Sequence, residues 1–156
     1  MPPTVGARAP AFTIVDTEKK SHTLAEFLGK KTVIAFFPGA FTGVCTKEMC
    51  AFRDSLSDLM KLNAQVVAIS TDSPFANKAF AEQNTFGFLV LSDITREVSK
   101  SYCGLYDRFA GVEGYLAAKR SVFVLDASGI VRFVWISENP GVEPNYDEVK
   151  KALASF

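Results

Sequence analysis

The sequence is poor in cysteine and histidine, and neither sign of charge is in surplus. Its 156 residues include three cysteines and one histidine, and 17 basic residues balance 17 acidic ones. Without a basic surplus the chain is poorly suited to neutralise a phosphate backbone, which argues against a nucleic-acid-binding protein. A zinc site is disfavoured, because there is no CxxC pair and His22 lies far from the cysteines in sequence. We therefore expect neither a metal nor another cofactor.

Long apolar runs and targeting signals are also missing. No apolar stretch approaches the roughly 18 residues that a membrane helix needs. The opening residues MPPTVGARAPAF lack the charged region and the apolar core of a signal peptide. We therefore expect a cytoplasmic protein that does not bind a membrane. Secreted disulfide frameworks usually carry an even set of cysteines, so Cys45, Cys50 and Cys103 are expected to have structural or catalytic roles.

Apolar residues are plentiful, and they are arranged as alternating strands and helices. Hydrophobic residues make up 48% of the chain, which is enough for a core without disulfide bonds in one domain spanning residues 1–156. Hydrophobic periodicity predicts strands at 12–17, 21–24, 32–37, 65–70, 88–91, 121–125 and 130–136, and helices at 44–62, from 73–74 onward, at 96–102 and at 146–155. This alternation predicts an α/β fold with an early hairpin at 12–24 and a late hairpin at 121–136, in whose turn Gly129 lies, and the late hairpin makes the sheet mixed. Ser73 and Asn145 are expected to cap the helices that follow them, and one face of the helix at 44–62 is expected to carry Val44, Met49, Phe52, Leu56, Leu59 and Met60.

The stretch FFPGAFTGVCTKEMC (residues 36–50) joins a predicted buried strand to a predicted helix. Ligand sites of α/β sheets form beyond the carboxyl ends of strands, where this stretch lies. Cys45 is expected in the first helical turn, where unpaired N–H groups and the helix dipole favour a thiolate. Pro38 ends the strand and can shield the thiolate from water. Thr42 offers a hydroxyl that can bind the sulfur or a substrate.

A purely structural interpretation of these residues is also available. Free cysteine is commonly a small buried residue, and Thr42 would then be an ordinary helix cap. However, the spacing P-x-x-x-T-x-x-C stands between a buried strand and a helix. This combination favours a reactive cysteine over the structural interpretation.

Three segments of the chain resemble one known family, the peroxiredoxins. PGAFTGVC, preceded by VIAFFP and followed by TKEMCAFRD, resembles their active-site signature. GARAPAFTIVD resembles their N-terminal hairpin, and AAKRSVFVLDASGIVRFVW resembles their late hairpin. The resemblance spans essentially the whole chain. It implies a thioredoxin-like fold with a mixed central sheet, flanking helices and an N-terminal hairpin extension, and a peroxidase that reduces hydrogen peroxide and alkyl hydroperoxides.

The resemblance also implies roles for individual residues. Cys45 would be the peroxidatic cysteine, which attacks the peroxide and becomes a sulfenic acid. Pro38, Thr42 and Arg120 match the other active-site positions of the family. Arg120 would lower the pKa of Cys45 and stabilise charge on the leaving oxygen. Glu48 matches a glutamate that positions the arginine.

The choice of Arg120 depends on the resemblance. From the residues alone, Arg120 would be interpreted as an exposed cation at the end of a strand. Lys119, Arg53 and Arg132 remain rival cations, because sequence does not place any of them relative to Cys45.

The cysteine that resolves the sulfenic acid is a separate question. Cys50 follows Cys45 by five residues, a spacing that resembles the Q-type (bacterioferritin-comigratory) branch of the family. On an intact helix their Cα atoms would be about 8–9 Å apart. A disulfide needs roughly 4.4–6.8 Å, so the bond requires the first turns to unravel. As alternatives, Cys50 packs in the core, or Cys103 is the resolving residue, or Cys103 merely ends a helix.

Other features resemble different members of the family. FFPGAFTGVC and SGIVRFVWISENPG are closer to one-cysteine, AhpE-like peroxiredoxins, in which an external thiol resolves the sulfenic acid. The expected partners are a hydroperoxide, a thioredoxin-like or other dithiol reductant, and a second copy of the chain, with Phe41 as a candidate contact. His22 is expected at the surface.

Two other functions are compatible with the residues. A thioredoxin-fold disulfide exchanger without peroxidase activity is disfavoured by the missing CxxC motif, which normally sets the exchange potential. A binding or chaperone protein with inert cysteines would leave the grouping of Pro38, Thr42, Cys45 and Arg120 without a simple explanation.

Overall fold

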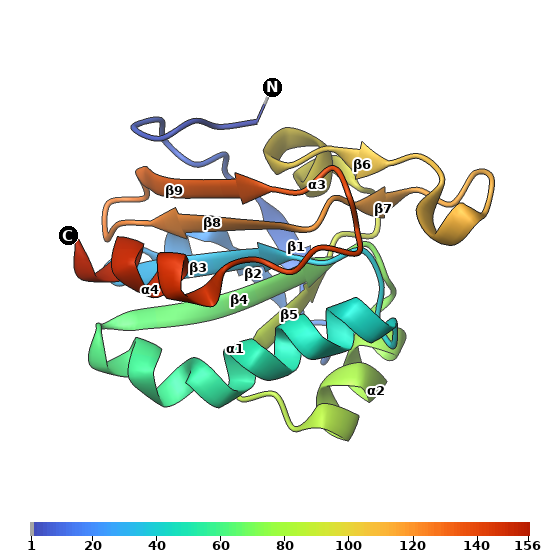
Figure 1. Cartoon of the computed structure of the whole chain (residues 1–156), viewed down its shortest axis with the longest axis horizontal. Helices are drawn as coiled ribbons and strands as arrows, with labels where there is room; N and C mark the ends of the chain where they lie inside the picture. Colours follow the sequence, from blue (N-terminus) through green and yellow to red (C-terminus); the bar gives the residue numbers. More distant parts are fainter. Residues whose placement is uncertain (1) are drawn as a thin grey trace.

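The computed structural model describes residues 2–156, which form a central sheet with helices on both faces (Figure 1). The strands are β1 (Thr13–Val15), β2 (Ser21–Thr23), β3 (Lys31–Phe36), β4 (Ala64–Ser70), β5 (Leu89–Ser92), β6 (Leu105–Tyr106), β7 (Ala117–Ala118), β8 (Ser121–Leu125) and β9 (Val131–Ile136). The α-helices are α1 (Gly43–Lys61), α2 (Pro74–Asn84), α3 (Glu97–Tyr102) and α4 (Tyr146–Ala154), and the short 3₁₀ helices are η1 (Leu24–Phe27) and η2 (Phe109–Gly111).

Seven strands form a mixed sheet in the order β2-β1-β5-β4-β3-β8-β9. The three central strands β5, β4 and β3 are parallel, while β8 runs antiparallel to β3. The β1–β2 and β8–β9 hairpins lie at the two edges, which confirms the predicted mixed sheet and both hairpins. The β6–β7 pair was not predicted, because each of its strands has only two residues and shows no alternation.

Alternate residues of β3 face two separate hydrophobic layers. Ile34 and Phe36 pack toward η1 and α3, whereas Val33 and Ala35 pack toward α1, α2 and α4. Both layers are apolar because β3 lies in the middle of the sheet, and its residues from Thr32 to Phe36 are buried. The sheet therefore separates two sets of buried side chains, and among the described residues a buried side chain of one layer does not contact the other layer.

Helix α1 follows β3 and begins one residue earlier than predicted. Its sheet-facing side buries Met49, Phe52 and Leu59. Met60 was also expected on this side, but that prediction is wrong, because its side chain is 65% exposed. Successive helical residues are about 100° apart, so the neighbours Leu59 and Met60 cannot both point to the sheet centre.

Local signals at the other helix ends and turns are confirmed. The Ser73 hydroxyl accepts a hydrogen bond from the Ala76 N–H at the start of α2. The Asn145 side chain accepts hydrogen bonds from two N–H groups at the start of α4. Gly129 has a positive φ of 86° in the β8–β9 turn. Within the described residues, no helix is both long and apolar enough to cross a membrane.

Candidate active site

Cys45 is the third residue of α1 and lies beyond the carboxyl end of β3. Its side chain is completely buried in the layer between the sheet and α1. Pro38 is also buried, and it follows the last backbone hydrogen bond between this segment and β4, from Phe37 N–H to the Ile69 carbonyl at 3.0 Å. The Thr42 hydroxyl donates to the Gly39 carbonyl at 3.0 Å and does not cap the helix through its side chain. The loop thus leads directly into the turn that holds the thiol.

The loop before α1 is held by contacts that the sequence alone did not reveal. The Ala40 N–H donates to the Asp72 carboxylate at 2.7 Å. Phe41 adopts a left-handed conformation with φ of 67°, and its half-exposed ring packs edge-on against Phe80 at 5.3 Å. A Cβ added to Gly39 would press on neighbouring side chains at about 3.3 Å. The only sequence signal for Asp72 was a polar residue just beyond the end of a buried strand.

Arg120 stands immediately before β8 and reaches across to α1. Its Nη2 donates to Cys45 Sγ at 3.2 Å, and its Nη1 donates to Glu48 Oε1 at 2.8 Å. Its Nε donates to the Pro140 carbonyl at 3.0 Å. The residue is only 1% exposed, so the interpretation as an exposed strand-end cation is wrong. Three partners on three sides hold the planar guanidinium in one orientation.

The rival cations all have other partners. Lys119 pairs with Glu138, Arg53 with Asp54, and Arg132 with Asp126. The structure therefore brings Thr42, Cys45, Glu48 and Arg120 together, with Pro38 buried in the preceding loop, and leaves the three rivals outside this site.

Burial dominates the acid–base behaviour of this site. It raises the pKa of the Cys45 thiol above its ordinary value, and this outweighs the lowering by Arg120, the Thr42 hydroxyl and the Gly39 backbone. The sequence predicted that the arginine and the helix end would lower this pKa. Arg120 does lower the pKa of Cys45, but the sequence did not indicate that Cys45 is completely buried, and burial has the larger effect. Burial also raises the pKa of Glu48, to about 7, against the opposing effect of Arg120.

A cavity of about 290 Å³ reaches Arg120 from the outside. It is lined by Thr42, Gly43, Val44, Phe109, Ala110, Arg120, Pro140 and Gly141. Hydrogen peroxide has about the size of two water molecules, which occupy roughly 60 Å³ in the liquid. The cavity is therefore large enough to bring a small hydroperoxide to the guanidinium.

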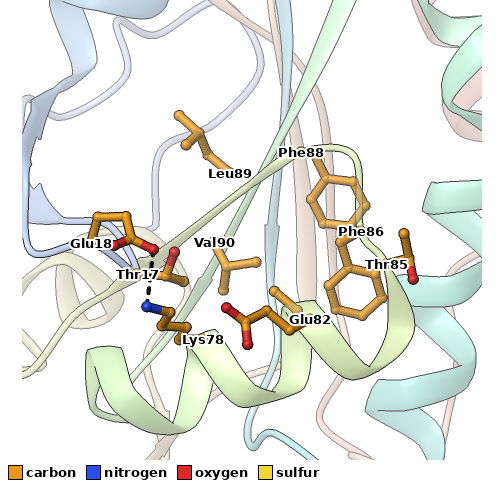
Figure 2. Close-up of a pocket in the computed structure, with 10 residues that line it drawn as sticks. Thr17, Glu18, Lys78, Glu82, Thr85, Phe86, Phe88, Leu89 and Val90 are labelled. Atoms are coloured by element: carbon orange, nitrogen blue, oxygen red, sulfur yellow. Dashed lines mark ion pairs between the residues drawn. The ribbon is translucent and has the colours of Figure 1, made fainter.

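A larger cavity of about 430 Å³ lies elsewhere, between the β1–β2 turn, α2 and β5 (Figure 2). Its lining residues are Thr17, Glu18, Lys78, Ala81, Glu82, Thr85, Phe86, Phe88, Leu89 and Val90. Lys78 and Glu18 form an ion pair of 3.3 Å across it. No cysteine lines this cavity, so it is not the site of thiol chemistry.

The other two cysteines occupy contrasting positions. Cys50 is partly buried on α1, and its thiol donates to the Asn84 side chain at 3.7 Å. Cys103 is buried in the layer on the opposite face of the sheet from Cys45. Burial raises the pKa of Cys103 to about 12. Cys103 therefore faces away from the site, whereas Cys50 shares a helix with Cys45.

His22 lies on the edge strand β2, and three strands separate β2 from β3, the strand that leads into α1. Its ring nitrogens contact Asp16 at 2.7 Å and Glu26 at 2.9 Å. The side chain is 17% exposed, so His22 lies only partly at the surface. Across residues 2–156, no group of three or more His, Cys, Asp or Glu side chains is arranged to hold a metal ion.

A cysteine at the amino end of the helix after β3, in contact with a buried arginine, is typical of a thiol-based oxidoreductase. The sequence profile of the AhpC/TSA family matches residues 5–134. Chloroplastic peroxiredoxin Q from Sedum lineare is 38% identical over 153 residues, covering 98% of this chain and 79% of that protein. The Populus jackii protein of the same name is 37% identical over 151 residues, covering 97% and 68%. The chain belongs to the AhpC/TSA family and is a peroxiredoxin of the Q/Bcp type.

Solved structures support the same assignment. Peroxidoxin BcpB from Mycobacterium tuberculosis is 30% identical, with a TM-score of 0.84, and the match covers 97% of this chain and 96% of that one. A peroxiredoxin-like protein from Aquifex aeolicus is 28% identical, with a TM-score of 0.86 and coverage of 98% and 87%. The predicted thioredoxin-like fold is therefore confirmed, and the protein is a thiol peroxidase. The alternatives without peroxidase activity do not hold.

Proposed function

We propose that Cys45 is the peroxidatic cysteine and that Pro38, Thr42 and Arg120 complete the reactive site. The observation that carries this proposal is the 3.2 Å contact between Arg120 Nη2 and Cys45 Sγ. Among the described cysteines, Cys45 alone accepts a hydrogen bond from a guanidinium. Its thiolate attacks the distal oxygen of the hydroperoxide, so that an S–O bond forms while the O–O bond breaks.

Each neighbour of Cys45 has a defined task in this step. Arg120 stabilises negative charge on the leaving oxygen, because its donors are fixed in place before the reaction. The Thr42 hydroxyl binds the peroxide or the sulfur, since it stands one turn before the thiol. Buried Pro38 keeps water from the sulfur and has no N–H that would need a partner. Glu48 holds Arg120 through the 2.8 Å contact to Nη1.

We propose further that Cys50 resolves the sulfenic acid as an intramolecular disulfide. Cys50 lies on the same helix as Cys45 and is partly exposed, whereas Cys103 lies across the sheet. The first turn must unravel for the bond to form, because an intact helix keeps the two Cα atoms about 8–9 Å apart. The contacts that must open include Thr46 N–H to the Thr42 carbonyl and Arg120 Nη2 to Cys45 Sγ. A thioredoxin-like dithiol then reduces the disulfide.

Peptide mapping after one equivalent of hydrogen peroxide tests this proposal. The reduced protein is expected to form a Cys45–Cys50 disulfide, which is absent from Cys50→Ser and retained in Cys103→Ser. Peroxide-dependent NADPH oxidation, coupled through thioredoxin and its reductase, is expected to follow the same pattern. A stable Cys45 sulfenic acid beside reduced Cys50 would instead make the protein a one-cysteine enzyme. Unmodified Cys45 would contradict the assignment of the peroxidatic residue.

We also propose that two copies of the chain associate through the surface around Phe41. The Phe41 ring is 50% exposed next to the site, and its backbone is held in a conformation that bulky residues rarely adopt. Exposed aromatic residues are enriched at protein interfaces. Phe41→Ser is expected to shift sedimentation equilibrium from dimer to monomer. Phe75→Ser, at a 70% exposed position on α2, serves as the control and is expected to leave the dimer intact.

A further inference from the structure

Glu48 is a fully buried carboxyl group with only half of its hydrogen-bonding capacity used. Its Oε1 accepts from Arg120 Nη1 at 2.8 Å. Its Oε2 is buried and has no hydrogen-bond partner among the described residues. An ionised carboxylate away from water needs partners on both oxygens, and a bare oxygen there is costly. A proton on Glu48 would remove the buried charge that this oxygen carries.

Arg120 is the single cation shared by two buried acids. It contacts Cys45 through Nη2 and Glu48 through Nη1, and all three side chains are at most 1% exposed. With one acid ionised, the buried group is neutral overall. With both ionised, it carries a net negative charge in a region of low dielectric constant, which is unfavourable.

The groups around this cluster do not supply a second buried positive charge. Glu143, in the loop between β9 and α4, faces Glu48 and raises its pKa. Tyr146 of α4 donates to Glu143 at 2.7 Å. Lys47 of α1 pairs with Glu143 at 3.8 Å, but its side chain is 75% exposed. These neighbours therefore favour keeping one proton on the pair formed by Cys45 and Glu48.

We propose that Cys45 and Glu48 share one exchangeable proton under Arg120, so that Glu48 holds this proton whenever Cys45 is the reactive thiolate. This proposal rests on the assignment of Cys45 as the peroxidatic residue. Two strongly interacting acids titrate in two macroscopic steps that belong to the pair. Burial raises the pKa values of both groups, which agrees with this sharing. The thiolate can thus form inside a dry site without the loss of a proton to solvent.

The shared proton also balances the peroxidase step. The Cys45 thiolate attacks ROOH, the S–O bond forms and the O–O bond breaks, which leaves a sulfenic acid and RO⁻. The proton held by Glu48 passes to RO⁻, giving ROH and a Glu48 carboxylate. Arg120 then has Glu48 as its counter-ion in place of the thiolate. The net charge of the buried group is the same before and after the reaction.

The pH dependence of Cys45 alkylation tests this proposal. The background is Cys50→Ser and Cys103→Ser, so that Cys45 is the only thiol. The parent protein is expected to show two steps separated by a plateau, because the pair loses its two protons separately. Glu48→Gln is expected to show one step, since a glutamine can still accept from Nη1 but cannot hold the proton. Glu143→Gln, which removes a nearby negative charge outside the pair, is expected to keep two steps.

Infrared spectroscopy distinguishes proton sharing from a merely structural role of Glu48. The C=O stretch of a protonated carboxyl group is expected to persist through the first alkylation step, to disappear with the second, and to be absent from Glu48→Gln. A one-step profile in the parent protein, or a carboxyl band that survives in Glu48→Gln, would overturn the proposal. Mass spectrometry of the peroxide-treated protein shows separately whether Cys45 forms a sulfenic acid, and so whether Cys45 is the peroxidatic residue. If the sulfenic acid forms but the profile has one step, only the proton sharing is wrong.

Discussion

Arg120→Met is expected to slow the oxidation of Cys45 by hydrogen peroxide by about 100- to 1000-fold. The variant removes the donor that lies 3.2 Å from Cys45 Sγ and would stabilise charge on the leaving oxygen. It also removes the charge that opposes the effect of burial on the thiol, so the pKa of Cys45 rises further. Methionine fills much of the same space without a charge, which limits the damage to packing. Stopped-flow measurement with limiting peroxide gives the rate.

Two controls accompany this variant. Lys119→Met removes the preceding cation, whose partner is Glu138 on the surface, and is expected to react at the parent rate. Arg120→Lys keeps the charge but replaces a rigid fork by a point charge, so it cannot bridge Cys45 and Glu48 in the same way. Its rate is expected to lie between those of Arg120→Met and the parent. If Arg120→Met, with its fold verified by circular dichroism, reacted as fast as Lys119→Met, the role of Arg120 would be disproved.

Phe80→Ala is expected to lower the free energy of unfolding by about 3–5 kcal/mol. Phe80 is completely buried on α2, and its ring contacts Phe37, Phe41 and Phe86. The loss combines the transfer free energy of a large apolar side chain with the cavity left between α2 and the sheet. Urea unfolding, followed by circular dichroism, measures this change.

The same variant is also expected to affect the redox step. Phe80 supports the ring of Phe41, which stands in the loop before α1. Without this support the first turn of α1 should open more readily, so the Cys45–Cys50 disulfide should form faster after oxidation. Phe75→Ala, on the same helix but 70% exposed, is the matched control and should change neither quantity appreciably. A loss of stability in Phe80→Ala as small as in the control would contradict the packing argument.

Much of the fold was predictable because its signals are local. Continuous apolar runs indicated the central strands and alternation indicated the first hairpin, while Ser73, Asn145 and Gly129 marked helix starts and a turn that the structure confirms. These signals depend on neighbours within a few residues, for which backbone geometry sets the rules. The pair β6–β7 was missed because two-residue strands carry no period. The prediction for Met60 failed because the core-facing side of α1 is narrower than its run of apolar residues suggests.

The sequence by itself determined the class of fold, the placement of Cys45 in the first turn of a helix after a buried strand, and the spacing to Cys50. Each of these depends on residues close together in the chain. Only the tertiary structure decided that Arg120 meets the thiol, because 75 residues separate the two along the chain. It also placed Cys103 across the sheet and buried Cys45 completely. Burial raises the pKa of the Cys45 thiol, an effect that no local pattern encodes, because it depends on everything packed around the sulfur.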